Sequence, residues 1–233
     1  VMIIEPSKSQ ISCKHTSLYE QMDEYDIPYV FIQGCFAQMM KKPYVLMDDV
    51  QGGYLITKYL ITMGHRRIAG VFKADDIQGR NRHKGYVHAL QEAGILYDPD
   101  YVVWFYTEDR EIKPRDAIAD YMSSGVLLDA VVCYNDQIAV EVIRSLQEHG
   151  MLVPRDISVT GFDNSLLAKN NRIRITSVSH PQEQLGIMAA ELLLKLIRKE
   201  KLAVEDTQIL IEPEVVVRDS TLERSENEYG TPG

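Results

Sequence analysis

The chain has 233 residues, 45% hydrophobic and 25% charged, which is ordinary globular composition and enough material for one large domain or two lobes. Its net charge of −9 at pH 7 argues against direct binding to nucleic-acid phosphates or anionic membranes, because such contacts need clustered Lys and Arg. No apolar run approaches the ~20 residues of a membrane span, Val1–Glu5 lacks a basic leader, and three cysteines without a CxxC motif favour a reduced, cytoplasmic compartment.

Runs of β-branched and aromatic residues predict strands along the whole chain, with helical patterns between most of them. The strands are expected at Met2–Ile4, Tyr29–Ile32, Tyr44–Met47, Ile68–Phe72, Val102–Phe105, Ala130–Tyr134, Ile157–Phe162 and Ser177–Ser179. The clearest helices are expected at Gly52–Met63, Ile138–Gln147 and Gln182–Lys199. Several strands are apolar on successive residues, which indicates that both of their faces are covered. The pattern therefore predicts an α/β fold with parallel sheets flanked by helices, followed by a flexible tail at 223–233.

Polar side chains follow most of these strands, at the point where each strand ends. They are Glu5, Gln33, Asp48-Asp49, Lys73, Asp75-Asp76, Asn135-Asp136, Asp163-Asn164 and His180. A single Asp or Asn at such a position is more often only a helix cap or turn residue. In an open parallel sheet, however, ligands bind beyond the carboxyl ends of the strands. Together these carboxylates and amides, with an arginine, favour a small polyhydroxylated ligand, and the run Trp104-Phe105-Tyr106 could supply an aromatic face for it.

Motifs for catalysis, metals and cofactors are weak or absent in the sequence. There is no GxGxxG, no P-loop, no HExxH, no Cys/His cluster at zinc spacing and no Gly-x-Ser-x-Gly. Asp48-Asp49 and Asp75-Asp76 could pass for a catalytic carboxylate pair, but neighbours in a strand point to opposite faces. One member of each pair is therefore expected to cap and the other to face the crevice. We predict a binding protein with no metal or cofactor; an α/β enzyme using paired carboxylates is one alternative.

Four stretches of the chain, read in order, carry a resemblance to a known family. They are YLITMGHRRIAGVF, RNRHKGYVHALQEAGI, DAVVCYNDQIAVEVIRSLQEHGMLVPRDISVTGFDN and ITSVSHPQEQLGIMAAELLLKLI. In this order they resemble the effector-binding half of the lactose/galactose-repressor family, which shares the type I fold of periplasmic sugar-binding proteins. The resemblance covers about Val1 to Ser220. Within the family, LMDDVQGGY, FKADDIQG and CYND are most similar to the L-arabinose-responsive repressors of Gram-positive bacteria.

The resemblance implies a set of sugar-binding residues. Arg82 matches the family's arginine that contacts ring and hydroxyl oxygens, Asn135 matches its amide, and Asp163 matches its carboxylate. His180 stands where relatives often have glutamine. Phe105 or Tyr106 is expected to stack on the sugar. The remaining candidates, at strand exits or near the hinge, are Glu5, Gln33, Lys73 and Asp76.

The resemblance also implies two lobes and a function. Residues 1–64 plus 181–204 would form the N-terminal lobe, and 65–180 plus 205–222 the C-terminal lobe. The family's first lobe begins with a strand–helix–strand–helix stretch that this chain lacks, so we expect an incomplete N-terminal lobe. The predicted function is the sugar-binding and dimerisation domain of a transcriptional repressor of carbohydrate catabolism. L-arabinose is the expected effector. It would bind between the lobes, change their angle and so lower the affinity for operator DNA, which a DNA-binding domain absent from this chain contacts. The second alternative is a sugar-binding protein of a transporter, which would have the same fold and pocket.

Overall fold

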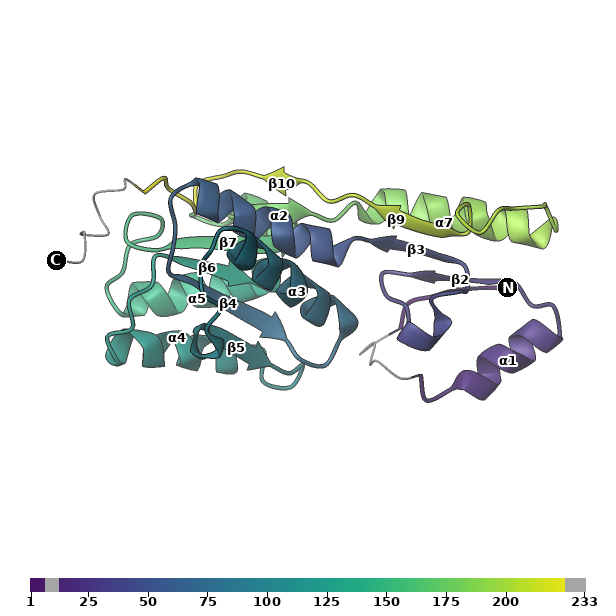
Figure 1. The fold of residues 1–233 in the computed structure, drawn as a ribbon, viewed down its shortest axis with the longest axis horizontal. Coiled ribbons are helices and arrows are strands. Elements are labelled where there is room, and N and C mark those ends of the chain that lie inside the picture. The colour runs from purple at the N-terminus through teal and green to yellow at the C-terminus, as the bar shows by residue number, and fades with distance from the viewer. Residues whose placement is uncertain (7–12, 225–233) are drawn as a thin grey trace. The chain divides into compact units, whose positions relative to one another are not determined.

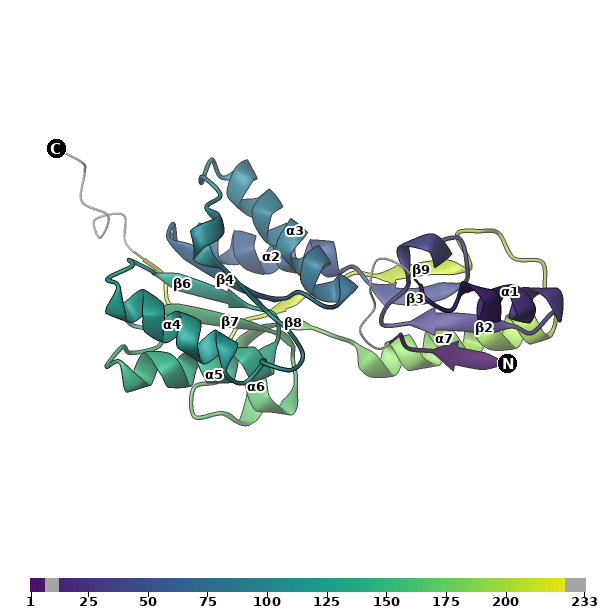
Figure 2. The same cartoon turned by 90° about the horizontal axis from the view of Figure 1, so that it is seen from below.

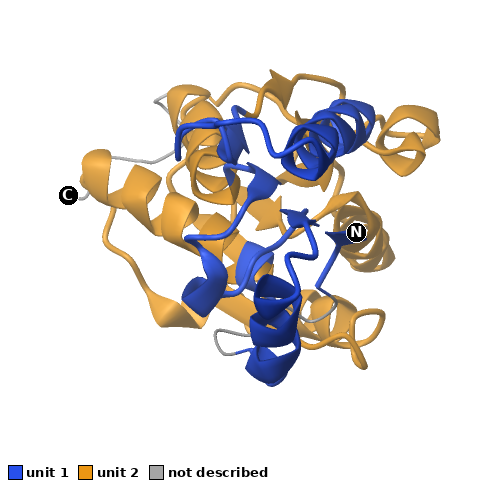
Figure 3. Cartoon of the chain, turned by 90° about the vertical axis from the view of Figure 1, so that its right-hand side faces the viewer, with its two compact units in different colours: residues 1–48, 75–78, 181–212 blue, residues 49–74, 79–180, 213–233 orange. Residues whose placement is uncertain are grey.

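The strands of the described residues, 1–6 and 13–224 of this computed structural model, form two separate sheets (Figure 1). Each sheet belongs to one of two compact units, which Figure 3 shows in different colours. Unit 1 consists of Val1–Asp48, Asp75–Gln78 and Pro181–Glu212, and unit 2 consists of Asp49–Ala74, Gly79–His180 and Pro213–Gly233.

Unit 1 is a four-stranded parallel sheet with helices on both faces. The strand order is β1 (Met2–Ile4), β2 (Tyr29–Ile32), β3 (Tyr44–Met47) and β9 (Gln208–Ile211). Alternate residues of β2 face opposite sides, as strand geometry requires. Phe31 packs with Tyr19 of α1 (Thr16–Glu24), whereas Val30 packs with Leu185 of α7 (Gln182–Ile197). A short 3-10 helix, η1 (Ala37–Met39), precedes β3.

Unit 2 is a six-stranded sheet. Its strand order is β10 (Val215–Val216), β8 (Thr176–Ser179), β7 (Ser158–Asp163), β6 (Ala130–Cys133), β4 (Ile68–Lys73) and β5 (Val102–Phe105). All neighbours are parallel except β10, which is antiparallel to β8. Figure 2 shows α2 (Asp49–Thr62) and α3 (Ile77–Glu92) on one side of the sheet, with α4 (Lys113–Ser123) and α5 (Asp136–Glu148) on the other. The shorter elements are η2 (Pro99–Tyr101) and α6 (Leu166–Asn170).

Helix α5 shows how sequence pattern becomes packing. Its side chains Ile138, Val142, Ile143 and Leu146 recur at helical spacing, and none is more than 4% exposed. They pack with Val131 and other core residues of the sheet, which form one cluster. The apolar face of the helix predicted at Ile138–Gln147 therefore covers one face of the sheet of unit 2.

Helices α2 and α3 approach each other closely because glycines stand at their contact. A Cβ atom added at Gly53 would fall on the backbone carbonyl of Arg82, and one added at Gly85 would fall on that of Val50. Only glycine permits this approach. This contact places Asp49, the first residue of α2, next to Arg82.

The predicted α/β fold with parallel sheets flanked by helices is confirmed, and each predicted strand overlaps an observed one. Strands β9 and β10 were not predicted. Both are short, and in the structure their residues are half-buried or exposed. No helix in the described part of the chain is long and apolar enough to cross a membrane.

The two units differ from the predicted lobes in three segments, 49–64, 75–78 and 205–212; residues 75–78 were assigned to the C-terminal lobe but belong to unit 1. Residues 49–64 were assigned to the N-terminal lobe, but α2 belongs to unit 2, because its residue Gly52 lies against the ring of Phe162 and Gly53 lies against α3. Residues 205–212 were assigned to the C-terminal lobe, but β9 belongs to unit 1, because it pairs with β3. Both divisions place a boundary between His180 and Pro181. Residues 225–233 of the predicted tail lie outside the described residues.

Candidate functional site

Arg82 is the centre of the polar residues that unit 2 brings together. Its side chain is buried on α3, where Nε donates to Oδ1 of Asp49 at 2.8 Å and Nη1 donates to the carbonyl oxygen of Tyr134 at 2.6 Å. Its Cζ lies 3.6 Å from the ring centroid of Phe162 and 4.7 Å from that of Tyr134. Burial by itself would lower the pKa of Arg82, but the carboxylates of Asp49 and Asp163 raise it further above its usual value. The guanidinium is therefore charged and fixed in orientation.

Asp163 lies on the exposed side of this guanidinium. Nη2 of Arg82 is 3.5 Å from Oδ1 of Asp163, which makes an ion pair but is too long for a good hydrogen bond. The Asp163 side chain is 29% exposed, compared with 8% for Asp49. Of the five N–H donors of an arginine, Asp49 and Tyr134 take two. A ligand hydroxyl beside Arg82 and Asp163 can accept from the guanidinium and donate to the carboxylate.

The turn after β7 holds Asp163 in an uncommon backbone conformation. Asp163 has φ of 90° and Asn164 has φ of 49°, so two successive residues other than glycine lie in the left-handed region. Such residues cost about 1–3 kcal/mol each and persist where their surroundings fix them, often at ligand sites. Here the backbone N–H of Asn164 donates to Oγ of Ser177 at 3.0 Å, and Arg218 donates to Oδ1 of Asn164.

Asn135 and Asp136, which follow β6, have structural partners. Oδ1 of Asn135 accepts from the backbone N–H of Ile138 at 3.1 Å and caps α5, which leaves the donors of its amide nitrogen for a ligand. Asp136 is 1% exposed. Its oxygens accept from Oγ of Ser177 at 2.6 Å and from the backbone N–H of Ser165 at 2.7 Å. Burial raises the pKa of Asp136, and these hydrogen bonds offset part of the rise. Asp136 therefore fixes the loop beside Asp163.

His180 stands at the end of β8 with an unused nitrogen. Its Nδ1 is buried and forms no hydrogen bond within the described residues. The pKa of His180 is lowered, chiefly by burial; Asp163 opposes this shift and Arg82 adds to it. Ser179, the residue before His180, pairs with Asp163 in the sheet. A buried nitrogen without a partner is costly unless a ligand or water uses it.

The structure divides the remaining predicted residues between the two units. In unit 2, Lys73 ends β4 and is half-buried, and Tyr106 is 55% exposed. Phe105 is 1% exposed and lies in the core with its ring 5.7 Å from that of Tyr134, which argues against stacking on a ligand. The candidates in unit 1 are Glu5, Gln33 and Asp76. Of these, Glu5 is exposed, Asp76 is buried, and the carbonyl oxygen of Gln33 accepts from Nε2 of Gln78 at 3.2 Å.

The arrangement therefore combines predicted residues with others that sequence reasoning did not select. We call the set the arginine site; it consists of Asp49, Arg82, Tyr134, Asn135, Phe162, Asp163 and His180. Asp49 was noted at a strand exit, but nothing in the sequence indicated its pairing with Arg82. Phe162 and Tyr134 end predicted strands. That their rings would lie against the guanidinium of Arg82 could not be predicted, because the contact depends on tertiary packing. No group of three or more His, Cys, Asp or Glu in the described ranges is arranged to hold a metal ion.

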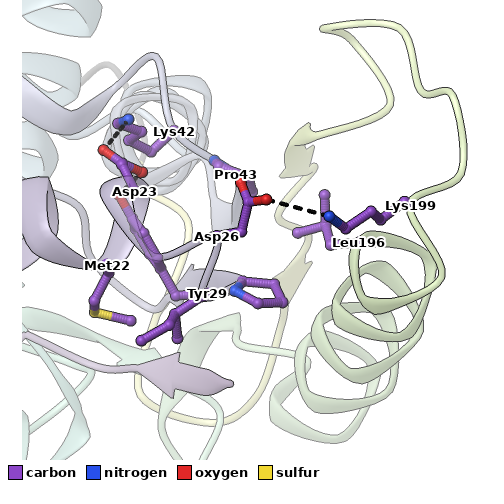
Figure 4. Close-up of a pocket in the computed structure, with 10 residues that line it drawn as sticks. Met22, Asp23, Asp26, Tyr29, Lys42, Pro43, Leu196 and Lys199 are labelled. Carbon is purple, nitrogen blue, oxygen red and sulfur yellow. Dashed lines mark hydrogen bonds and ion pairs between the residues drawn. The ribbon is translucent and has the colours of Figure 1, made fainter.

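A hollow of about 420 Å³ lies elsewhere, on unit 1 (Figure 4). Pro28 and Pro43, at the amino ends of β2 and β3, line it, so it lies at the opposite edge of that sheet from the polar strand exits. Its charged side chains form two ion pairs, Lys42 with Asp23 at 2.6 Å and Lys199 with Asp26 at 3.2 Å. Because these charges satisfy each other, the arginine site is the better candidate for a polar ligand.

Comparison with known proteins gives consistent matches. Residues 57–221 match the family model described as periplasmic binding protein-like domain. The chain is 37% identical over 227 residues to the arabinose metabolism transcriptional repressor of Halalkalibacterium halodurans, and 36% identical over 225 residues to that of Geobacillus stearothermophilus. These alignments cover 95% of this chain and 60% and 61% of the two relatives. The chain thus spans about three fifths of the length of each relative.

A solved structure extends these matches to three dimensions. The transcriptional regulator CelR in complex with cellobiose superposes with a TM-score of 0.80 at 29% sequence identity. The match covers 94% of this chain and 64% of the CelR chain.

Proposed function

The chain belongs to the periplasmic binding protein-like domain family, and from this premise we propose that it is the sugar-binding domain of a transcriptional repressor of arabinose metabolism. The observation that carries the proposal is the Arg82–Asp163 pair, a fixed guanidinium beside a half-exposed carboxylate. The similarity to two arabinose repressors supports the sugar, and the CelR–cellobiose complex supports a carbohydrate ligand for this fold. The sugar-carrier alternative is not favoured, because these relatives are named as transcriptional regulators.

The chemistry of the arginine site suits a monosaccharide. Vicinal hydroxyls need paired donors and acceptors, and a planar guanidinium supplies donors in a fixed fork. Asp163 supplies the acceptors, and the Nδ2 of Asn135 supplies a further donor. We propose Tyr106 as the stacking aromatic, since it is exposed whereas Phe105 is not. The further sugar contacts that we propose in unit 2 are Lys73 and His180.

We propose that the sugar acts as an effector and undergoes no reaction. Binding would favour one conformation of the chain by as much as its affinity differs between conformations. A coupling of about 1–3 kcal/mol would change operator affinity roughly 5- to 150-fold. In this proposal the protein is a cytoplasmic homodimer, and operator DNA is bound by a separate domain of the whole protein.

The direct test is thermal unfolding of the purified protein with and without L-arabinose. At a sugar concentration of about 100 times Kd, we expect stabilisation by about 2.7 kcal/mol, which raises Tm by roughly 5–10 °C for a protein of this size. D-arabinose is the matched control, because it has the same groups with opposite handedness and should give a smaller shift. If no pentose or hexose shifts Tm, the sugar proposal is wrong.

Sugar binding should also weaken in acid through His180. Because burial lowers its pKa in the folded protein, His180 is neutral above its unfolded pKa of about 6.5. Its contribution to stability is fully present there and is lost as pH falls through the lower, folded pKa. Protonation would add positive charge near Arg82 and remove an acceptor. We therefore expect the Kd for L-arabinose to rise as pH falls from about 7 to 5, and to rise less in His180→Gln.

His83→Gln is the matched control for this pH effect. The pKa of His83 is also lowered by burial, but its ring packs against Trp104 with 4.8 Å between centroids, and neither Arg82 nor Asp163 contributes to the shift. Calorimetric titrations at several pH values compare the three proteins. Equal pH dependence in the wild type and His180→Gln would contradict the assignment.

A further inference from the structure

Asp49 is a buried carboxylate that directly bonds the central residue of the arginine site. It is 7% exposed and lies in the first turn of α2, and its Oδ1 accepts from Nε of Arg82 at 2.8 Å. Asp49 is also the first residue of unit 2 after the chain leaves unit 1 at Asp48. A carboxylate this deeply buried needs a charged partner, and Arg82 provides one.

The backbone around this pair is fixed by the close approach of two helices. Gly53 lies one turn after Asp49 on α2, against the carbonyl of Arg82, and Gly85 lies one turn after Arg82 on α3, against the carbonyl of Val50. Because no Cβ fits at either glycine, the two helices touch through their backbones. Asp49 and Arg82 therefore meet with little freedom to move apart.

Asp49 and Asp163 contact different parts of the guanidinium. Asp49 takes the Nε donor on the buried side, whereas Asp163 faces Nη2 on the exposed side at 3.5 Å. The centroid of the Phe162 ring lies 3.6 Å from Cζ of Arg82, so the ring limits rotation of the guanidinium out of its own plane. With Nε bonded to Asp49 and Nη1 bonded to the carbonyl oxygen of Tyr134, Nη2 is the nitrogen that faces Asp163.

We propose that Asp49 is a positioning residue for sugar binding, acting through Arg82 without touching the sugar. The inference rests on the proposed function. Asp49 holds the guanidinium so that Nη2 stays 3.5 Å from Asp163, without a short hydrogen bond, and a sugar hydroxyl beside the two groups can bond to both. Without the charge of Asp49, the guanidinium would move toward Asp163, its other carboxylate, and form a direct hydrogen-bonded pair. That pair would compete with the sugar for both groups.

The test is calorimetric titration of the purified protein with L-arabinose in an Asp49→Asn variant. Asparagine keeps the size of the side chain and an acceptor oxygen for Nε but removes the charge. We expect Kd to rise by a factor on the order of 10–100, since small displacements of a binding group have effects of this size. Thermal unfolding of each variant shows whether it is folded.

The matched control is Asp129→Asn. Asp129 is 2% exposed, also in unit 2, and pairs with His65 and with the backbone N–H groups of Arg66 and Arg67. Its replacement should lower Tm but leave the Kd for L-arabinose within about twofold, because its partners lie outside the arginine site. A general loss of stability would weaken binding in both variants, whereas a positioning role weakens it only in Asp49→Asn.

A double-mutant cycle separates positioning from an independent effect. In an Arg82→Lys background, Asp49→Asn should change Kd by less than about twofold, because the forked group that Asp49 orients is gone. The inference is overturned if Asp49→Asn binds as well as the wild type, or if its effect is undiminished in that background. If the wild type itself binds no pentose or hexose, it is the proposed function that fails, and this inference falls with it.

Discussion

Arg82→Ala is expected to abolish the stabilisation by L-arabinose and to destabilise unit 2. The substitution removes the donors for the sugar and leaves the carboxylate of Asp49, 7% exposed, without its arginine. Breaking a buried ion pair by removing one partner costs about 3–5 kcal/mol. If the free energy of sugar binding falls by a similar amount, Kd rises roughly 100-fold or more, since each 1.4 kcal/mol or so changes Kd about tenfold. Titration calorimetry and thermal unfolding measure the two effects.

Arg82→Lys separates charge from geometry in this prediction. Lysine keeps the positive charge for Asp49 and should retain much of the stability. Its single ammonium group cannot reproduce the fork that bonds Asp49 and Tyr134 and still presents donors to a ligand. We therefore expect folded protein with strongly weakened sugar binding. Full affinity in either variant would show that Arg82 does not contact the sugar.

Asp163→Asn is expected to weaken sugar binding with little loss of stability. Each hydrogen bond to a charged group contributes about 1.5–3 kcal/mol, so losing the charge should raise Kd roughly 10- to 150-fold. Stability should change little, because the side chain is 29% exposed and its ion pair with Arg82 spans 3.5 Å. Asparagine is preferred to alanine here, because it tolerates the left-handed backbone at φ of 90°.

Asp219→Asn is the control for that substitution. Asp219 belongs to the same unit and forms an ion pair with Arg174 at 2.7 Å, but it is exposed and has no contact with the arginine site. Its replacement should change neither Kd nor Tm appreciably, since exposed ion pairs contribute little. Equal effects of Asp163→Asn and Asp219→Asn on Kd would contradict the assignment of Asp163.

Strand positions were predictable because they depend on local pattern. The runs at Tyr44–Met47 and Ala130–Tyr134 are apolar on successive residues, and both form buried parallel strands. The location of ligand-type residues at strand ends followed from the same reasoning. Strand β9 was not predicted, although Ile209–Ile211 is an apolar run as long as that of the predicted strand β1. The assignment of α2 to unit 2 could not be predicted, because it depends on which sheet the helix packs against.

The arginine site was predictable only in part. Arg82, Asn135 and Asp163 were selected through the resemblance of their motifs, and the structure describes all three in unit 2. Asp49 was noted at a strand exit, but its pairing with Arg82 was not predicted, because the two residues are 33 positions apart in sequence. Phe105 and Tyr106 could not be distinguished from sequence, since Val102–Tyr106 is apolar or aromatic throughout and gives no alternation to show which side chain is buried. In the structure Phe105 is 1% exposed and Tyr106 is 55% exposed.

The most direct measurement is a structure of the protein determined with L-arabinose bound. We expect one sugar per chain, with hydroxyl groups within hydrogen-bonding distance of the guanidinium of Arg82 and the carboxylate of Asp163. Asp49 should remain bonded to Nε of Arg82 and should not touch the sugar. A sugar bound elsewhere, for example in the hollow lined by Asp23 and Lys199, with no contact to Arg82 or Asp163, would show that the arginine site is not the sugar site.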